Sequence, residues 1–453
     1  MSETSDRDFV PSSPKAAEAG GESVGRPKIP FEAKHWSLLA LCLIPAGFLC
    51  LSGAPERLPM VHLCMLAIGL LAIGIERVLR RPRASEILLL AAPAALCILN
   101  LLYRNGFLFA VNQLAIPLLS AAALFSLAGI AEEPPLSCRA FVWTALESLR
   151  GLFCHWALPF RVLWRGVAAQ NRAKIGVAFL SVVFCVPVLT LVVLLLADAD
   201  AVFWETLTGL FSGEGPAWSH VLRVALTVVV ALMFFSWLTV LRTPKRDRRA
   251  ASTGLSIPAM FPAILLPMLN VVYALFTYIQ FSNLFGGAAH AAMAGGYAEY
   301  ARSGFFQLVL VAGINLIVLA VAIHASRGPW MRTMSALLIA ATAVLLVSAF
   351  WRMRLYILAF GMTVLRALTL WGMIAIAALL IIAAIALFVR RFPAVSAALA
   401  CLIVLWVGLN AVDLDARIVS YNVDAYLSGQ LETIDADYLR TLNGGEEALS
   451  RLE

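Results

Sequence analysis

Residues 367–389 read ALTLWGMIAIAALLIIAAIALFV, 23 residues without one charged side chain. Because about 20 apolar residues in a helix cross a hydrocarbon core about 30 Å thick, this stretch predicts a transmembrane helix. Similar stretches recur along the 453 residues, of which 61% are apolar and 13% charged, whereas soluble chains have ~45–50% and ~25%. The chain is therefore predicted to be a polytopic membrane protein, and secreted, collagenous and disordered classes are excluded.

Eleven segments are apolar and long enough to span a bilayer. The predicted fold class is therefore all-α: a polytopic helical membrane bundle of about 11 transmembrane helices within residues 35–412. Residues 1–34 are polar and predict a disordered cytoplasmic tail, and residues 413–453 predict a short helical extracytoplasmic tail. The predicted spans are 36–53, 58–79, 87–103, 107–130, 175–197, 220–241, 258–281, 303–324, 333–350, 367–389 and 393–412.

The basic residues indicate on which side of the membrane each loop lies. If the N-terminus is cytoplasmic and eleven spans alternate, cytoplasmic segments hold 24 of the 34 Lys and Arg residues. Loop 197–219, on the opposite side, has no Lys or Arg but four carboxylates. The positive-inside rule therefore predicts an N-in, C-out topology. Because the basic residues lie in short loops rather than on a soluble module, no nucleic-acid partner is expected.

Residues 138–173 do not fit a simple span. Trp143, Leu146, Leu149, Phe153 and Trp156 are interspersed with arginines. This pattern predicts an amphipathic helix, or two, on the cytoplasmic membrane surface. A cytoplasmic loop packed beneath the bundle is an equally good interpretation.

Polar side chains also share one face of the predicted span 258–281. Asn270, Tyr273, Thr277 and Gln280 follow helical spacing. One interpretation is hydrogen bonding between helices that holds the bundle together. The functional alternative is that these four residues line a polar groove.

Two arginines in residues 351–366 oppose the topology rule. Read as one helix, Arg352, Tyr356, Thr363 and Arg366 share a polar face on the side that should be poor in arginine. Arginines can snorkel to the interface from within the apolar layer. The functional interpretation is a site for an anion or a lipid headgroup, which guanidinium groups bind well.

The last span and its flanking loops carry further polar candidates. We expect the helix to continue past 412, with Asp413 paired to Arg417 four residues on, or to Arg352 or Arg366, as a structural clamp. Loop 283–307 contains two Gly-Gly pairs and, near its end, Glu299 and Arg302. A mobile loop that closes over a site and an ordinary loop with a salt bridge at its end share this pattern. The complete candidate polar site is Glu299, Tyr300, Arg302, Arg352, Tyr356, Thr363, Arg366, Asp413, Arg417, Asn422 and Asp424.

Enzyme signatures are few in this chain. It has no GxxxxGK[ST], HExxH or GxSxG motif, its six histidines are scattered, and its eight cysteines form no CxxC pair. Asp198 and Asp200 form a DxD motif, which can hold a metal ion in glycosyl transfer. A motif of three residues is weak evidence, and the alternative is that this segment is simply the end of a helix. We expect no cofactor and no metal, and no catalytic residue is predicted.

Four motifs in this order resemble a family of bacterial inner-membrane proteins, domain of unknown function 4173, close to 4153. They are LLADADAVF (195–203), YAEYARSGFFQLV (297–309), WRMRLYILAFGMTVLR (351–366) and the tail DLDARIVSYNVDAYLSGQLETIDADYLRTL (413–442). The resemblance covers residues 175–442 and implies a multi-pass inner-membrane protein without an assigned activity. It also implies that Gly361 and most of the candidate polar site lie in the family's motifs.

Three hypotheses for function follow. The leading one is a non-enzymatic protein acting in envelope transport, lipid handling or regulation through a polar site on the outer half of the last five helices. Its partners would be the bilayer and an anionic lipid or lipid-linked ligand. The alternatives are a membrane-embedded transferase acting on a lipid-linked substrate, with Asp198 and Asp200 or Glu299 in its site, and a non-catalytic membrane scaffold that uses the C-terminal tail.

Overall fold

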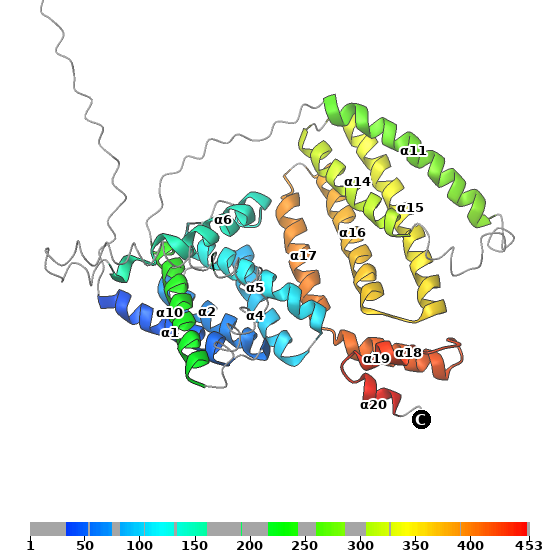
Figure 1. The fold of residues 1–453 in the computed structure, drawn as a ribbon. Helices are drawn as coiled ribbons and strands as arrows, with labels where there is room; N and C mark the ends of the chain where they lie inside the picture. The colour runs from blue at the N-terminus through cyan, green and yellow to red at the C-terminus, as the bar shows by residue number, and fades with distance from the viewer. Residues whose placement is uncertain are drawn as a thin grey trace, which may run out of the picture.

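The computed structural model describes residues 33–52, 55–74, 82–103, 105–130, 134–160, 192, 216–242, 260–285, 305–325, 328–389 and 391–450. All regular elements within these ranges are helices (Figure 1). The predicted span 175–197 lies outside the described residues, except for residue 192, and so does the predicted tail up to residue 32. The observed fold therefore confirms the all-α class.

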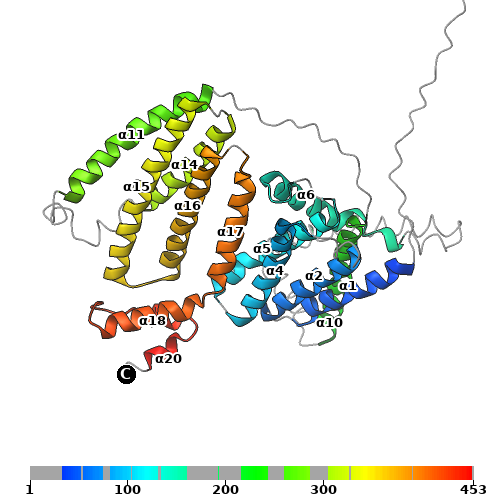
Figure 2. The same ribbon diagram turned by 180° about the vertical axis from the view of Figure 1, so that it is seen from behind.

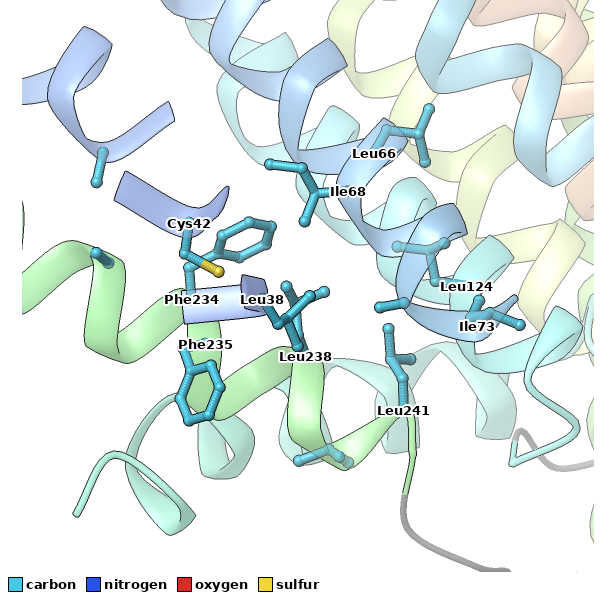
Figure 3. Packing of buried hydrophobic residues seen from close by; sticks show 14 of the residues in the cluster. Leu38, Cys42, Leu66, Ile68, Ile73, Leu124, Phe234, Phe235, Leu238 and Leu241 are labelled. Atoms are coloured by element: carbon cyan, nitrogen blue, oxygen red, sulfur yellow. The ribbon is translucent and has the colours of Figure 1, made fainter. Parts of the chain in front are cut away.

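Helices from the N-terminal half pack around one apolar core. The core lies between α1 (Ala33–Ser52), α2 (Leu58–Ile73), α5 (Gly106–Leu127) and α10 (Pro216–Val240). Its buried members include Leu38 and Cys42 from α1, and Phe235 and Leu238 from α10 (Figure 3). A short 3₁₀ helix (Pro55–Arg57) precedes α2, and α4 (Ala84–Leu102) packs against α5. These contacts form the first of two helical groups.

The second group consists of α11 (Met260–Phe285), α14 (Phe305–Ala325), α15 (Pro329–Phe360), α16 (Val364–Phe388) and α17 (Ala394–Asn410). The first four share a second apolar core. Helix α17 packs against α16 on one side and against α4 of the first group on the other. It therefore joins the two groups, as Figures 1 and 2 show.

Seven of the described helices are long and apolar enough to cross a membrane, and an eighth span is counted if α17 and the following helix form one bent span. Helices α1 and α2 are apolar but shorter. Every predicted span other than 175–197 coincides with one of these helices. The structure thus supports a membrane protein with seven or eight such helices, and the predicted count of eleven and the orientation remain predictions.

Helix α15 is longer than one span requires. It has 32 residues, which is about 48 Å at 1.5 Å per residue. The rise from Arg332 to Arg352, 20 positions on, is about 30 Å, the thickness of a hydrocarbon core. The helix is thus long enough for Arg352 and Arg354 to lie beyond one span, and the side of the membrane that they face remains a prediction.

Helix α6 (Cys138–Cys154) forms the described part of the predicted amphipathic segment; residues 161–173 lie outside the described residues. Small buried residues, Ala140, Thr144 and Gly151, form its face toward α10 and α5. The opposite face exposes large apolar side chains. The amphipathic helix is therefore observed, and its location at the membrane surface or beneath the bundle remains a prediction. The exposed apolar residues are Val142, Leu146, Leu149 and Phe153.

The C-terminal tail forms α18 (Leu414–Leu427), α19 (Ala436–Arg440) and α20 (Gly445–Leu449). Helix α18 bends 61° away from α17 and runs crosswise below the ends of α15 and α16 (Figure 2). The expectation that the last helix continues past residue 412 is therefore wrong, because α17 ends at Asn410 and α18 begins at Leu414. A separate apolar cluster anchors the tail, with Leu414, Ile418 and Leu439 packed near Leu108 of α5 and the start of α16.

Candidate functional site between the α15–α16 turn and the C-terminal tail

A tight turn separates α15 from α16 and interrupts the predicted polar face. Gly361 ends α15 with a φ of +74°, a backbone conformation that favours glycine. Two residues later, Thr363 caps α16, and its hydroxyl accepts a hydrogen bond from the Arg366 backbone N–H at 3.4 Å. The prediction of one continuous helical face through Arg352, Tyr356, Thr363 and Arg366 is therefore wrong.

The turn nevertheless brings Arg366 back onto α15. Its Nη1 donates hydrogen bonds to the carbonyl oxygens of Phe360, at 2.8 Å, and Gly361. The guanidinium also lies 4.2 Å from the centre of the Tyr356 ring, a cation–π distance. A cation at the C-terminus of a helix stabilises the unpaired carbonyls there. Arg366 and Tyr356 thus form one contact, across the turn rather than along one helix.

The tail holds this turn through two side chains. The Asn422 Oδ1 accepts a hydrogen bond from the Met362 N–H at 2.7 Å, and its Nδ2 donates to the Met362 carbonyl at 2.8 Å. The Tyr438 hydroxyl accepts a hydrogen bond from the Val364 N–H at 2.8 Å. We call this set of contacts the tail clamp. It satisfies turn backbone groups that would otherwise lack a helical partner.

A cavity of about 300 Å³ lies between the turn and the tail. We call it the turn–tail cavity. Its wall combines a guanidinium, a carboxylate, hydroxyls and an amide with apolar side chains. It is lined by Ala359, Phe360, Met362, Thr363, Arg366, Asn422, Leu431, Thr433, Ile434, Asp435, Tyr438 and Leu439.

The pKa of Tyr438 is affected by the charged groups around this cavity. Burial raises the pKa of its phenol above the usual value, and the carboxylates of Asp415 and Asp435 act in the same direction. The hydrogen bond from Val364 and the charge of Arg366 act in the opposite direction. The pKa of this phenol therefore depends on both charged groups of the cavity wall, Arg366 and Asp435. The phenol stays neutral at physiological pH.

Other predicted site residues lie outside the cavity. Asp413 caps α18, accepting a hydrogen bond from the Ala416 N–H at 3.2 Å, while the Arg417 side chain is exposed. The exposed carboxylate of Asp424 accepts a hydrogen bond from Ser420 at 3.2 Å. The ion pairs found in the described ranges join Glu147 to Arg150 and Asp437 to Arg440, so the predicted Asp413–Arg417 pair is not among them.

Several predicted residues fall where no side chain is described. Glu299, Tyr300, Arg302, Asp198 and Asp200 lie outside the described residues. The side chain of Gln280 is likewise outside the description, although its backbone belongs to α11. Their assignments remain predictions. Among the described residues, no group of His, Cys, Asp and Glu side chains is arranged to hold a metal.

The predicted groove residues of α11 make contacts between helices. The Tyr273 hydroxyl donates to Asn315 of α14 at 2.8 Å, and Asn315 donates to Thr342 of α15 at 2.9 Å. Asn270 donates to the Met334 carbonyl of α15 at 3.0 Å. These bonds favour the interpretation that this face joins helices; the half-buried Thr277 lies on the same helix.

A buried polar ladder joining the two helical groups was missed by the sequence reasoning. The Asn112 Nδ2 donates to Asn100 at 2.8 Å and to Asn410 at 2.6 Å, and its Oδ1 accepts from the Trp406 Nε1 at 2.9 Å. These residues come from α4, α5 and α17. Each is a single asparagine or tryptophan in its segment, so only the tertiary fold brings them together.

A buried carboxylate on α18, Asp415, was also missed. It is 4% exposed and accepts hydrogen bonds from Asn105 at 2.5 Å and from the Asn443 side chain at 3.0 Å. Asn105 caps α5, so this contact fastens the tail to the first helical group. Helical position gave a hint, because Asp415 falls on the same face as the apolar Ile418 and Val419.

Comparison with known proteins places the chain in a family. The model of DUF4153, a domain of unknown function, matches residues 87–452. The chain belongs to this family. The match confirms the predicted resemblance to a family of unknown function, and it begins well before the 175–442 covered by the quoted motifs. No curated protein and no solved structure matches the chain.

The lining of the turn–tail cavity can offer both polar and apolar contacts to a ligand. Asp435 and Arg366 provide one charge of each sign, and hydroxyl groups lie in the same wall. Such side chains can provide hydrogen bonds and charge for a polar group, while Phe360, Leu431 and Ile434 can contact an apolar one.

Proposed function

We propose that this DUF4153 protein is a multi-pass protein of the bacterial inner membrane, with N-in, C-out topology, that binds a membrane lipid in the turn–tail cavity. Its role would be lipid handling in the cell envelope, without catalysis. The observation that carries this proposal is the mixed polar and apolar wall of a 300 Å³ cavity at the end of a membrane-length helix. Ligand pockets in proteins usually have volumes of about 300–1,000 Å³, so this cavity is large enough for a small ligand group.

The position of the cavity supports access from the bilayer. Helix α16 carries an uncharged apolar run that begins at residue 367, directly after Arg366 of the cavity wall. With this run in the hydrocarbon, the cavity lies at its edge, where lipid headgroups lie. The apolar part of the wall would contact the glycerol and first methylenes, and the polar part the headgroup.

The distribution of charge supports the orientation. The tail end of the bundle carries the acidic α18–α20 segment, whereas α6 lies at the opposite end (Figure 1). Hydrogen bonds connect the helix ends on the α6 side, from Arg242 to the Ala72 carbonyl at 3.1 Å and from Ser396 to the Leu136 carbonyl at 2.7 Å. In the sequence, 24 of the 34 Lys and Arg residues lie in segments that this orientation makes cytoplasmic, as the positive-inside rule expects.

A cavity-filling variant tests lipid binding. We expect Thr433→Trp to occupy the cavity and to reduce the phospholipid that copurifies with the full-length protein, measured by lipid mass spectrometry. Glu432→Trp is the matched control, because Glu432 is exposed like its neighbour Thr433 but does not line the cavity. Equal lipid content in the two variants and the wild type would contradict the proposal.

A further inference from the structure

The charges in the turn–tail cavity narrow the class of lipid. Arg366 and Asp435 both line the cavity, so its wall presents one positive and one negative group. A purely anionic headgroup would pair with Arg366 but would be repelled by the Asp435 carboxylate. A headgroup that carries both charges can satisfy both groups at once.

Arg366 has donors left for such a headgroup. Its bonds to the Phe360 and Gly361 carbonyls both use Nη1. A guanidinium carries five N–H donors, and those on Nε and Nη2 make no hydrogen bond to the described part of the chain. Guanidinium groups suit phosphate oxygens in particular. Thr363, at the N-cap of α16, adds a hydroxyl to the same wall.

The Asp435 carboxylate is held in place by a hydrogen bond to one of its two oxygens. Its Oδ1 caps α19 by accepting a hydrogen bond from the Tyr438 N–H at 3.0 Å. The other oxygen can accept a bond from an ammonium group. Arg366 and Asp435 line the same cavity together with Tyr438, so a headgroup that occupies it has one group of each charge in its wall.

We infer that the cavity binds a headgroup with both a phosphate and a primary ammonium group, as in phosphatidylethanolamine, the phosphate at Arg366 and the ammonium at Asp435. This inference rests on the proposed function of the cavity. It replaces the anionic lipid expected from the arginines alone with a zwitterionic one. A choline headgroup has no N–H to donate to Asp435, and a glycerol headgroup has no positive charge.

Headgroup selectivity tests this inference. The full-length protein in detergent is titrated by native mass spectrometry with phosphatidylethanolamine, phosphatidylcholine and phosphatidylglycerol of equal chain length. We expect wild-type protein to prefer phosphatidylethanolamine over each of the others by about fivefold, the worth of a partly exposed ion pair. Soluble glycerophosphoethanolamine is added in a separate arm, and we expect it to bind less tightly because it lacks the acyl chains.

The matched variants are Asp435→Asn and Asp437→Asn. Asparagine is a good N-cap, so Asp435→Asn removes the charge and keeps the start of α19. We expect it to abolish the preference, whereas Asp437→Asn, which alters the exposed partner of Arg440, keeps it.

The possible outcomes separate this inference from the proposed function. Equal binding of the three lipids by wild-type protein, or a preference that survives Asp435→Asn, would overturn the inference and leave lipid binding intact. Absence of binding by every lipid would overturn the proposed function as well. Tight binding of glycerophosphoethanolamine alone would uphold the headgroup chemistry and refute a lipid as its source.

Discussion

Gly361→Ala should release the C-terminal tail from the end of the bundle. Gly361 has a φ of +74° and a ψ of −175°, a region of backbone conformation that is essentially restricted to glycine, and an added Cβ would collide with Asn422 Oδ1. The strain costs about 1–3 kcal/mol. The collision also displaces the two hydrogen bonds between Asn422 and Met362, each worth about 1 kcal/mol. The expected destabilisation of the docked tail is therefore about 3–5 kcal/mol.

Gly429→Ala is the matched control, because Gly429 has a similar φ of +71° but open space around its Cβ position. It should cost only about 1 kcal/mol. Trypsin cleavage at Arg440 in the full-length protein measures the opening of the tail. When opening and closing are fast, the cleavage rate follows the open population, and each 1.4 kcal/mol is about a tenfold change. Gly361→Ala should thus accelerate cleavage about 100-fold or more, and Gly429→Ala about fivefold.

A double variant checks the cause. Asn422→Ala alone already removes the clamp on Met362, so adding it to Gly361→Ala should cost about 2 kcal/mol less than the sum of the two single changes. Equal cleavage rates for Gly361→Ala and Gly429→Ala, or strict additivity in the double variant, would refute the clamp.

Three further predictions concern other parts of the fold. Asn112→Leu should lower the free energy of unfolding of the detergent-solubilised protein by about 2 kcal/mol, because it leaves three hydrogen-bond partners in α4 and α17 unpaired. The control Gln113→Leu, which loses one hydrogen bond within its own helix, should lower it less; thermal unfolding measures both. Because burial raises the pKa of Tyr438 above its usual value near 10, the docked tail should keep its stability at lower pH and lose it as the pH rises beyond 10. Trypsin cleavage measured against pH should show this loss, and Tyr438→Phe, which also forfeits the bond from Val364, should remove it. Leu149→Glu on the exposed face of α6 should destabilise the protein in lipid nanodiscs by about 1–2 kcal/mol, whereas Leu149→Met should not, if this face lies in the headgroup layer; equal melting temperatures would contradict that placement.

The spans were predictable because each long apolar run can satisfy its backbone in a bilayer only as a helix. The turn was not predicted, although its signals are present in the sequence. Gly361 is a residue typical of a helix C-terminus, and Thr363 is typical of an N-cap. Helical spacing at 100° per residue cannot reveal such a break. The spacing of Tyr356 and Arg366 fits one helical face, although a turn separates the two residues.

Some of the candidate residues named from the sequence lie together at the turn, and their role in a site remains a prediction. Tyr356, Thr363, Arg366 and Asn422 were named as candidates, and the fold gathers them at one turn. Asp435, however, looked like one carboxylate among many in an acidic tail. Only the docking of α19 next to Val364 brings it into the wall of the cavity.

The scaffold hypothesis also concerns the docked tail. Asp415 and Asn422 of α18, and Tyr438 of α19, all bond to the bundle of their own chain. The scaffold hypothesis remains a prediction for the exposed residues of the tail, such as Tyr426 and Leu427. The transferase hypothesis depends on Asp198, Asp200 and Glu299, and it remains a separate prediction for those residues.

Photo-crosslinking in native membranes tests lipid binding in the turn–tail cavity most directly. A phosphatidylethanolamine with a photoreactive group next to its headgroup is incorporated into cells that produce the full-length protein, and the modified peptides are identified by mass spectrometry. Adducts should concentrate on residues 359–366 and 431–439, and Thr433→Trp should remove them while Glu432→Trp does not. Adducts spread over the lipid-facing sides of α11 and α16, with none in these two segments, would contradict the account.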